Sequence, residues 1–365
     1  MGCSLPSPSR RTAIPSIRAV GGIGCRRHHN KGGIAVDADR TTSTLWSNWT
    51  CEAVLSVLLA CAPQLAHAQT RFELRPVETV TLSPQEILLG DKNGKPVMLA
   101  EELRIPKPGT DRLPAVILMH SAGAINPATD QWAQEFNNMG IATLTVDSFS
   151  GRGFYTFGDQ LKLDGLAMMI YAYRALESLA LHPRIDPNRI AVMGFSKGAA
   201  AAVYSSNERF RKLYGPPNVE FAAHIGLYAP YVMLHDDDKV TGKPIRLFHG
   251  IADDLAPIEP GRAYVERLKA AGVDVALTEY QDTYHAYDFF WRKEPAKFPQ
   301  APTDRNCPLV EGDGGQFLNG KTGKPFDPNL CMVKEVTGAY YNEEATVATT
   351  KAVKEFLMAT FHLKE

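Results

Sequence analysis

The sequence lacks an excess of charge of either sign. It holds 39 lysine and arginine residues against 40 aspartate and glutamate residues, which gives a net charge of −1 over 365 residues. The acidic run Asp236, Asp237 and Asp238 is short, and we expect it to lie in a solvated loop. Proteins that bind nucleic acids usually present a basic face, so this balance argues against a nucleic-acid partner.

The sequence also lacks an apolar run long enough to cross a membrane. Residues 53–62, AVLSVLLACA, are apolar, but a spanning helix needs about 20 such residues. They are followed by Ala66, His67 and Ala68, the small-x-small pattern that a signal peptidase cleaves. We therefore expect export to the periplasm or the medium, cleavage near Ala68, and no stable membrane insertion of the mature chain. The alternative is a lipoprotein-type site at Cys61, which would tether the protein to a membrane.

The first 39 residues have no apolar periodicity and are rich in Ser, Pro, Gly, Arg and His. This composition is typical of a disordered segment or of an over-extended gene start. We expect residues 1–68 to be an extension with a signal peptide, and residues 69–365 to form a single domain.

Cysteine is scarce in the part of the chain that would remain after cleavage. Four of the six cysteines lie before residue 69 (Cys3, Cys25, Cys51 and Cys61), which leaves Cys307 and Cys331. Both lie in residues 293–337, a segment rich in Gly, Pro and Asp that we interpret as an insertion. A disulfide between them is expected in an oxidising compartment, and two unrelated buried thiols are the alternative. Neither Cys307 nor Cys331 lies beside histidines at metal-ligand spacing, so we predict no metal site.

From Phe72 onward, short apolar runs alternate with helical patterns. This alternation predicts an α/β fold with a mostly parallel, doubly wound sheet, flanked by helices and binding ligands at the carboxyl ends of its strands. The first two strands have no helix between them and are expected to form an antiparallel edge. The expected strands are residues 77–82, 97–105, 115–120, 141–147, 190–195, 222–228, 245–249 and 273–280, and the expected helices are residues 130–138, 160–181, 196–207, 259–271 and 343–361.

The pattern Gly194-Phe195-Ser196-Lys197-Gly198 joins one of these strands to the helix that follows. In a sharp strand-turn-helix, the central residue is strained, and small residues on both sides allow the strand and the helix to pass closely. Such an elbow presents the serine hydroxyl at the top of the sheet. We therefore predict that Ser196 is a nucleophile, the alternative being a serine that only caps the helix.

A serine nucleophile needs a base, and the base needs a carboxylate that orients it. Asp253 and Asp254 follow the strand 245–249 in the sequence GIADDLAP, and the Gly-x-x-Asp spacing favours Asp253. The alternative is that both are turn residues. His285 follows the last strand, and we predict that it is the base. Structural roles are expected for three histidines at or within strands: His120, His224 and His249.

Two backbone amides are candidates for an oxyanion hole. The amide of Lys197 lies at the start of a helix, and that of Ala122 lies in a loop of small residues after the strand 115–120. Farther along, Arg152 in the loop VDSFSGRG either contacts an acidic substrate or braces its loop through an ion pair.

Five motifs together resemble the dienelactone hydrolase family, which has the α/β-hydrolase fold. They are AVILMHSAGA, VDSFSGRG, GFSKGA, HGIADDLAP with YVERLKAAGVDVALTEY, and YHAYD, and the resemblance covers residues 96–290. The resemblance implies a catalytic triad of Ser196, Asp253 and His285, a fold with no large lid, and hydrolysis of an ester or lactone without a cofactor.

The chain departs from this family in two places. Dienelactone hydrolases have a cysteine nucleophile and an acidic residue in the loop after the first central strand, whereas this chain has Ser196, and His120 and Ser121 in that loop. We therefore expect an exported serine esterase acting on a small ester or lactone. Two alternatives remain: a peptidase of the prolyl oligopeptidase type, which normally carries an additional propeller domain, and a non-catalytic exported binding protein. The segment 293–337 is longer than a minimal member needs and is expected to border the active-site mouth.

Overall fold

We describe a computed structural model of the chain, which covers residues 70–303 and 305–364. The predicted extension and signal peptide lie outside the described residues, as do Ala68 and Cys61, so export and lipid anchoring stay predictions. None of the helices within the described ranges has the length and apolar character needed to cross a membrane.

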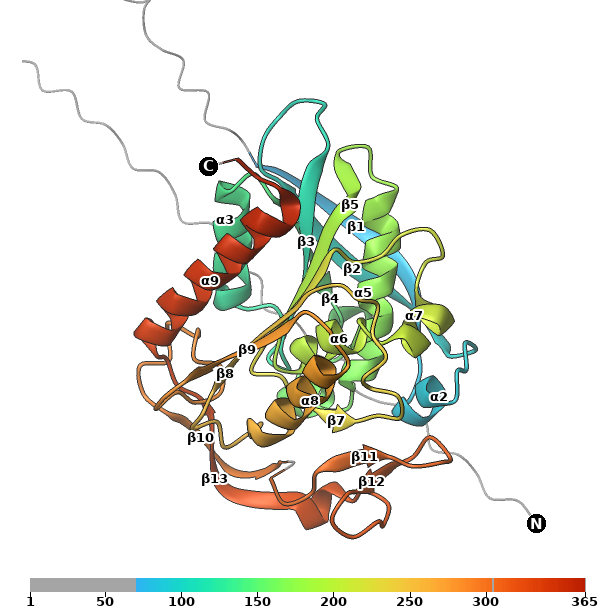
Figure 1. Cartoon of the computed structure of the whole chain (residues 1–365), viewed down its shortest axis with the longest axis vertical. Coiled ribbons are helices and arrows are strands. Elements are labelled where there is room, and N and C mark those ends of the chain that lie inside the picture. Colours follow the sequence, from blue (N-terminus) through green and yellow to red (C-terminus); the bar gives the residue numbers. More distant parts are fainter. Residues whose placement is uncertain (1–69, 304, 365) are drawn as a thin grey trace, which may run out of the picture. The chain divides into compact units, whose positions relative to one another are not determined.

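Eight strands form the central sheet, in the order β1-β2-β4-β3-β5-β6-β8-β9 (Figure 1). All eight strands predicted from the sequence are present in it, with ends that differ by up to six residues. Their bounds are β1 Arg71–Thr81, β2 Lys95–Ile105, β3 Leu113–Met119, β4 Ala142–Asp147, β5 Ile185–Phe195, β6 Ala223–Leu227, β8 Ile245–Gly250 and β9 Val275–Tyr280.

The sheet is antiparallel only at one edge. Strand β1 pairs antiparallel with β2, and β2 pairs antiparallel with β4. Each of the other neighbouring pairs, from β4 and β3 to β8 and β9, is parallel. The predicted mostly parallel sheet with an antiparallel edge is therefore confirmed. Every residue of the central strand β3 is buried, as expected for a strand covered on both faces.

Helices cover both faces of the sheet (Figure 1). Helices α3 and α9 share one apolar cluster with the sheet, and α5 and α6 share another with its opposite face. A third cluster joins α8 to α6. The helices with their bounds are α2 Pro84–Leu88, α3 Pro127–Asn138, α4 Phe157–Gln160, α5 Gly165–Ala180, α6 Lys197–Tyr204, α7 Glu208–Tyr214, α8 Glu259–Ala270 and α9 Glu343–Phe361.

Two of the predicted helices are in fact interrupted. The helix predicted over residues 160–181 is divided into α4 and α5, because the Asp164 side chain accepts a hydrogen bond from the amide of Leu166 and begins a new helix. The helix predicted over residues 196–207 ends at Tyr204, and the Asn207 side chain caps the next helix, α7. In both places a capping side chain breaks a continuous apolar pattern.

The segment predicted to be an insertion forms two small sheets. Strands β10 Ala296–Pro302 and β13 Met332–Ala339 pair antiparallel, while β11 Leu309–Glu311 pairs with β12 Phe317–Asn319 and with β7 Val232–Met233. A short 3-10 helix, Pro328–Cys331, precedes β13. Cys307 and Cys331 are bonded to each other, so the expected disulfide is confirmed.

Candidate active site

Ser196 lies at the junction between β5 and α6, in a strained backbone conformation. Its φ is 52° and its ψ is −117°, a region that non-glycine residues rarely occupy. The Ser196 amide donates to the carbonyl of Leu227 at 3.0 Å, which fixes the turn against the neighbouring strand β6. The Ser196 side chain makes no capping hydrogen bond to α6. The geometry therefore matches the predicted elbow rather than a simple helix cap.

The two glycines of the elbow are required by close backbone contacts. A Cβ atom on Gly194 would lie 1.9 Å from the carbonyl oxygen of Gly198, and one on Gly198 would lie 2.0 Å from the oxygen of Met119. Both distances are far shorter than any tolerated contact. The glycines thus let α6 start directly over β5 and β3, which leaves the Ser196 hydroxyl at the carboxyl end of the sheet.

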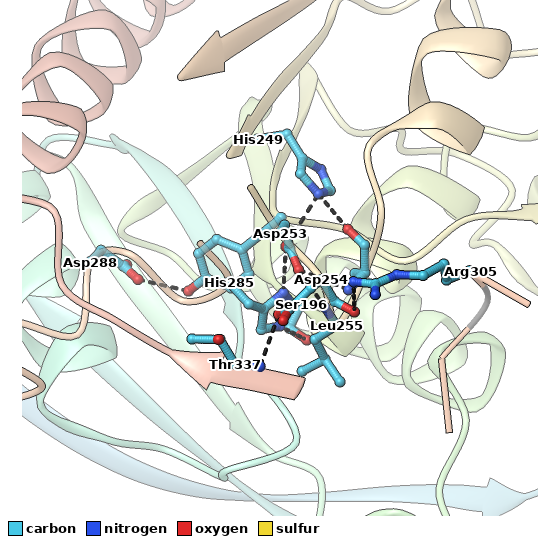
Figure 2. Close-up of polar contacts among 11 residues, drawn as sticks. Ser196, His249, Asp253, Asp254, Leu255, His285, Asp288, Arg305 and Thr337 are labelled. Atoms are coloured by element: carbon cyan, nitrogen blue, oxygen red, sulfur yellow. Dashed lines mark hydrogen bonds and ion pairs between the residues drawn. The ribbon is translucent and has the colours of Figure 1, made fainter. Parts of the chain in front are cut away.

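The structure brings Ser196, His285 and Asp253 together in one hydrogen-bonded relay, which Figure 2 shows. The Nε2 atom of His285 lies 2.9 Å from the Ser196 Oγ, and its Nδ1 atom lies 2.7 Å from the Asp253 Oδ2. Because a carboxylate only accepts, Nδ1 carries the hydrogen, and Nε2 is left to accept from the serine hydroxyl. His285 and Asp253 are each 4% exposed, whereas Ser196 is half-buried.

Four hydrogen-bond donors surround the carboxylate of Asp253. The amides of Leu255 and Ala256 donate to Oδ1 at 3.0 and 2.8 Å, and the imidazoles of His285 and His249 face Oδ2 at 2.7 and 3.3 Å. Burial by itself would raise the pKa of Asp253. The electrostatic attraction of His285 and the hydrogen bonds from both histidines outweigh burial and hold that pKa well below its ordinary value. Asp253 therefore stays ionised beside His285.

His249 also belongs to this site, although the sequence predicted only a structural role for it. It is fully buried, and its Nε2 atom faces both the carbonyl of Ala256, at 2.8 Å, and the Asp253 carboxylate. Two acceptors on one nitrogen require that Nε2 carries a hydrogen. The spacing of His249 and Asp253, four residues apart at the end of β8, is the signal that could have indicated the contact.

Asp254, the alternative acid, points elsewhere. Its Oδ1 atom accepts a hydrogen bond from the amide of Thr337 in β13, at 2.9 Å. The structure therefore separates the two neighbouring carboxylates: Asp253 faces His285, and Asp254 faces β13.

The ring of His285 packs against an aromatic side chain. The ring of Tyr228, at the end of β6, meets the His285 ring edge-on with centroids 4.8 Å apart. The Tyr228 hydroxyl donates to Asp288 at 2.8 Å, and the indole nitrogen of Trp132 donates to the other oxygen of Asp288 at 3.0 Å. The sequence did not predict a role for Tyr228 or Asp288, because no motif or spacing around them indicates that they lie beside His285.

The two predicted oxyanion donors lie in suitable elements. Lys197 is the first residue of α6, where backbone amides have no partner within the helix. Ala122 lies in the loop between β3 and α3, where the Ser121 side chain accepts a hydrogen bond from the amide of Gly123. The roles of both amides stay predictions.

The Lys197 side chain turns away from the relay and holds the end of α4. Its Nζ atom donates to the carbonyls of Gln160 and Leu161 at 2.9 and 3.4 Å. Burial lowers the pKa of Lys197 to about 8, although the carboxylate of Asp164 opposes this change.

Arg152 braces its own loop, but through hydrogen bonds with uncharged partners rather than through an ion pair. Its guanidinium donates to the Thr81 hydroxyl, the Ser148 carbonyl and the Tyr171 hydroxyl, and it stacks on the ring of Tyr171. These contacts occupy all three guanidinium nitrogens.

His120 and His224 have the structural roles that the sequence predicted. His120 accepts a hydrogen bond from the amide of Ser148 through Nε2, at 3.0 Å, and its Nδ1 atom lies 2.8 Å from the Ser121 carbonyl. The Nδ1 atom of His224 lies 3.0 Å from the hydroxyl of Ser205, and burial lowers the pKa of His224 to about 4.

Part of the chain matches a family model described as phospholipase/carboxylesterase. The match spans residues 168–289, about a third of the chain, and this range includes Ser196, Asp253 and His285. An acyl-protein thioesterase 1 from Gibberella zeae is 32% identical over 103 residues. That alignment covers 28% of this chain and 43% of the thioesterase, so the chain matches less than half the length of this relative.

The matched family model, the sheet order and the elbow after β5 together decide the fold. The chain has the α/β-hydrolase fold. Its similarity to solved α/β hydrolases is distant. A dienelactone hydrolase-like promiscuous phosphotriesterase from metagenomic libraries is 15% identical with a TM-score of 0.46, over 79% of this chain and 98% of that chain. A putative dienelactone hydrolase from Klebsiella pneumoniae is 13% identical with a TM-score of 0.49, over 80% of this chain and 100% of that chain.

Within residues 70–303 and 305–364, no group of three or more His, Cys, Asp or Glu side chains is arranged to hold a metal ion.

Proposed function

We propose that the protein hydrolyses carboxylic ester or lactone bonds by acyl transfer to Ser196. The observation that carries this proposal is the relay from the Ser196 hydroxyl through His285 to Asp253, with contacts of 2.9 and 2.7 Å. A serine, a base in the correct tautomer and a buried carboxylate are the parts that nucleophilic acyl transfer needs. The partial match to a phospholipase/carboxylesterase family supports this class of reaction.

In the first step, the Ser196 oxygen attacks the ester carbonyl while His285 Nε2 takes the hydroxyl proton. The carbonyl oxygen becomes negatively charged, and the amides of Lys197 and Ala122 would stabilise it. The C–O bond to the alcohol then breaks, and His285 returns the proton to that alcohol. This leaves an acyl ester on Ser196.

In the second step, a water molecule replaces the alcohol. His285 takes a proton from the water, which attacks the acyl carbonyl, and the proton passes back to Ser196 as the acid leaves. Asp253 stays ionised throughout and stabilises the imidazolium that forms in each step. The four donors on its carboxylate keep it in place for this task.

The test is the hydrolysis of a p-nitrophenyl ester by the protein and by Ser196→Ala. We expect the substitution to lower kcat by several orders of magnitude without changing the circular dichroism spectrum, because the nucleophile is lost and the elbow backbone remains. Labelling of the parent protein, but not of the variant, by a fluorophosphonate would support the same conclusion. Equal rates for parent and variant would contradict it.

We further propose that the mature protein works in an oxidising compartment after export. The disulfide between Cys307 and Cys331 supports this proposal, because such bonds persist mainly outside the reducing cytoplasm.

A further inference from the structure

The insertion, residues 293–337, makes polar contacts with the loop that carries the acid of the relay. Two of them involve Asp254, the residue next to Asp253. The amide of Thr337 in β13 donates to the Asp254 carboxylate at 2.9 Å, and the guanidinium of Arg305 donates to the Asp254 carbonyl at 3.0 Å. Both contacts appear in Figure 2.

The peptide unit that Arg305 holds also supports the relay directly. The Asp254 carbonyl belongs to the peptide bond between Asp254 and Leu255, and the N–H of that same bond donates to the Asp253 Oδ1 at 3.0 Å. A hydrogen bond to the oxygen of a peptide polarises its N–H and strengthens it as a donor. The orientation of the Asp253 carboxylate therefore depends on where the insertion holds this peptide.

The residues directly after the insertion reach the loop that carries the base. Just after β13, the amide of Tyr340 donates to the carbonyl of His285 at 3.3 Å, and the amide of Asn342 donates to the carbonyl of Tyr287 at 2.9 Å. The end of β13 thus lies along both the acid loop and the base loop.

The insertion also meets the segment beside the nucleophile. The rings of Phe298 in β10 and Phe157 in α4 are stacked, with centroids 5.6 Å apart. Helix α4 is in turn held by Lys197, the residue after the nucleophile, through the carbonyls of Gln160 and Leu161. The acid loop therefore contacts the insertion directly, and the segment beside the nucleophile is linked to it through α4. The base loop contacts the residues that directly follow the insertion.

The contacts of Asp254 join parts of the chain that lie far apart in the sequence. Asp254 and Thr337 are 83 residues apart, and Asp254 and Arg305 are 51 residues apart. The disulfide between Cys307 and Cys331 joins the two ends of the loop that connects Arg305 to β13, so it holds both partners of Asp254 in one unit.

We propose that the insertion is a positioning element for the reaction, and that Asp254 is the positioning residue through which it keeps Asp253 aimed at His285. Asp254 touches neither the substrate nor His285 in this scheme. It acts by fixing the backbone of the acid loop, whose amides donate to the Asp253 carboxylate. The proposal rests on the ester hydrolysis proposed above.

The experiment compares kcat and KM for a p-nitrophenyl ester in the full chain, in Asp254→Ala and in Asp254→Asn. Asp254→Ala removes the acceptor for the Thr337 amide, and we expect kcat to fall about tenfold, because small displacements of a reacting group are costly. KM should stay within about twofold, since no substrate contact is lost. Asp254→Asn keeps an oxygen that accepts from Thr337 and should recover most of kcat.

Asp313→Ala is the matched control, because Asp313 is an exposed carboxylate in the same insertion. Active sites are counted by fluorophosphonate titration, so that a loss of folded protein is not mistaken for a loss of rate. Equal kcat values for the full chain and Asp254→Ala would overturn the proposal, and so would an Asp254→Asn variant as slow as Asp254→Ala. If the full chain itself neither hydrolyses the ester nor reacts with the fluorophosphonate, the ester-hydrolase proposal is the one that fails.

Discussion

Asp253→Asn is the substitution whose effect the structure specifies most fully. An asparagine side chain has nearly the same shape as aspartate, and its oxygen could still accept from the amides of Leu255 and Ala256. Its NH₂ group would then take the place of Oδ2. That group would face His285 Nδ1 at 2.7 Å and His249 Nε2 at 3.3 Å, where the native carboxylate accepts hydrogen bonds.

The consequence is a base in the wrong tautomer. Because the asparagine NH₂ donates, His285 Nδ1 must accept, and its hydrogen moves to Nε2, which faces the Ser196 hydroxyl. His285 can then no longer take the serine proton, and no negative charge stabilises the imidazolium. In serine hydrolases, such a change costs about 10⁴-fold in kcat, which corresponds to about 5 kcal/mol of transition-state stabilisation.

The assay is steady-state hydrolysis of a p-nitrophenyl ester, with fluorophosphonate labelling as a second measure of nucleophile reactivity. We expect KM to change little, since Asp253 is buried behind His285 and does not line the open side of the site. A residual activity within tenfold of the parent protein would refute the reasoning. It would mean that another group performs the role assigned to Asp253.

Two further predictions concern stability. Burial lowers the pKa of Lys197 from 10.5 to about 8, so between these pH values the unfolded chain holds a proton that the folded chain has released. The free energy of unfolding of the parent protein relative to Lys197→Met should therefore rise by up to about 3 kcal/mol from pH 8 to pH 10.5. Melting temperatures of the two proteins measure this difference, and a constant or falling difference would contradict this sign. Reduction of the disulfide between Cys307 and Cys331, which are 24 residues apart, should lower the free energy of unfolding by about 3 kcal/mol. Urea denaturation with and without reductant measures this loss. The double variant with Cys307→Ser and Cys331→Ser should not respond to reductant. An unchanged unfolding midpoint of the parent protein would show that the bond does not stabilise the fold.

The sequence by itself predicted the parts of the molecule that depend on local patterns. The alternation of apolar strands and helical segments predicts the sheet and its antiparallel edge, because period-two and period-3.6 patterns are set residue by residue. The elbow is also local, since Gly194 and Gly198 are needed for contacts within one strand-turn-helix unit. Ser196, Asp253 and His285 could be chosen because each of them follows a predicted strand, and the carboxyl ends of these parallel strands lie at the same edge of the sheet.

The tertiary structure decided which side chains meet at that edge. Two neighbouring aspartates look equivalent in the sequence, and only the folded backbone sends Asp253 to His285 and Asp254 to Thr337, 83 residues away. Tyr228 joins the site for the same reason, because parallel strands bring together residues that lie far apart along the chain. His249, in contrast, lies only four residues before Asp253 and meets it across the turn after β8. The contacts of the disulfide-bonded insertion likewise depend on long-range packing, for which no local pattern in the sequence provides a signal.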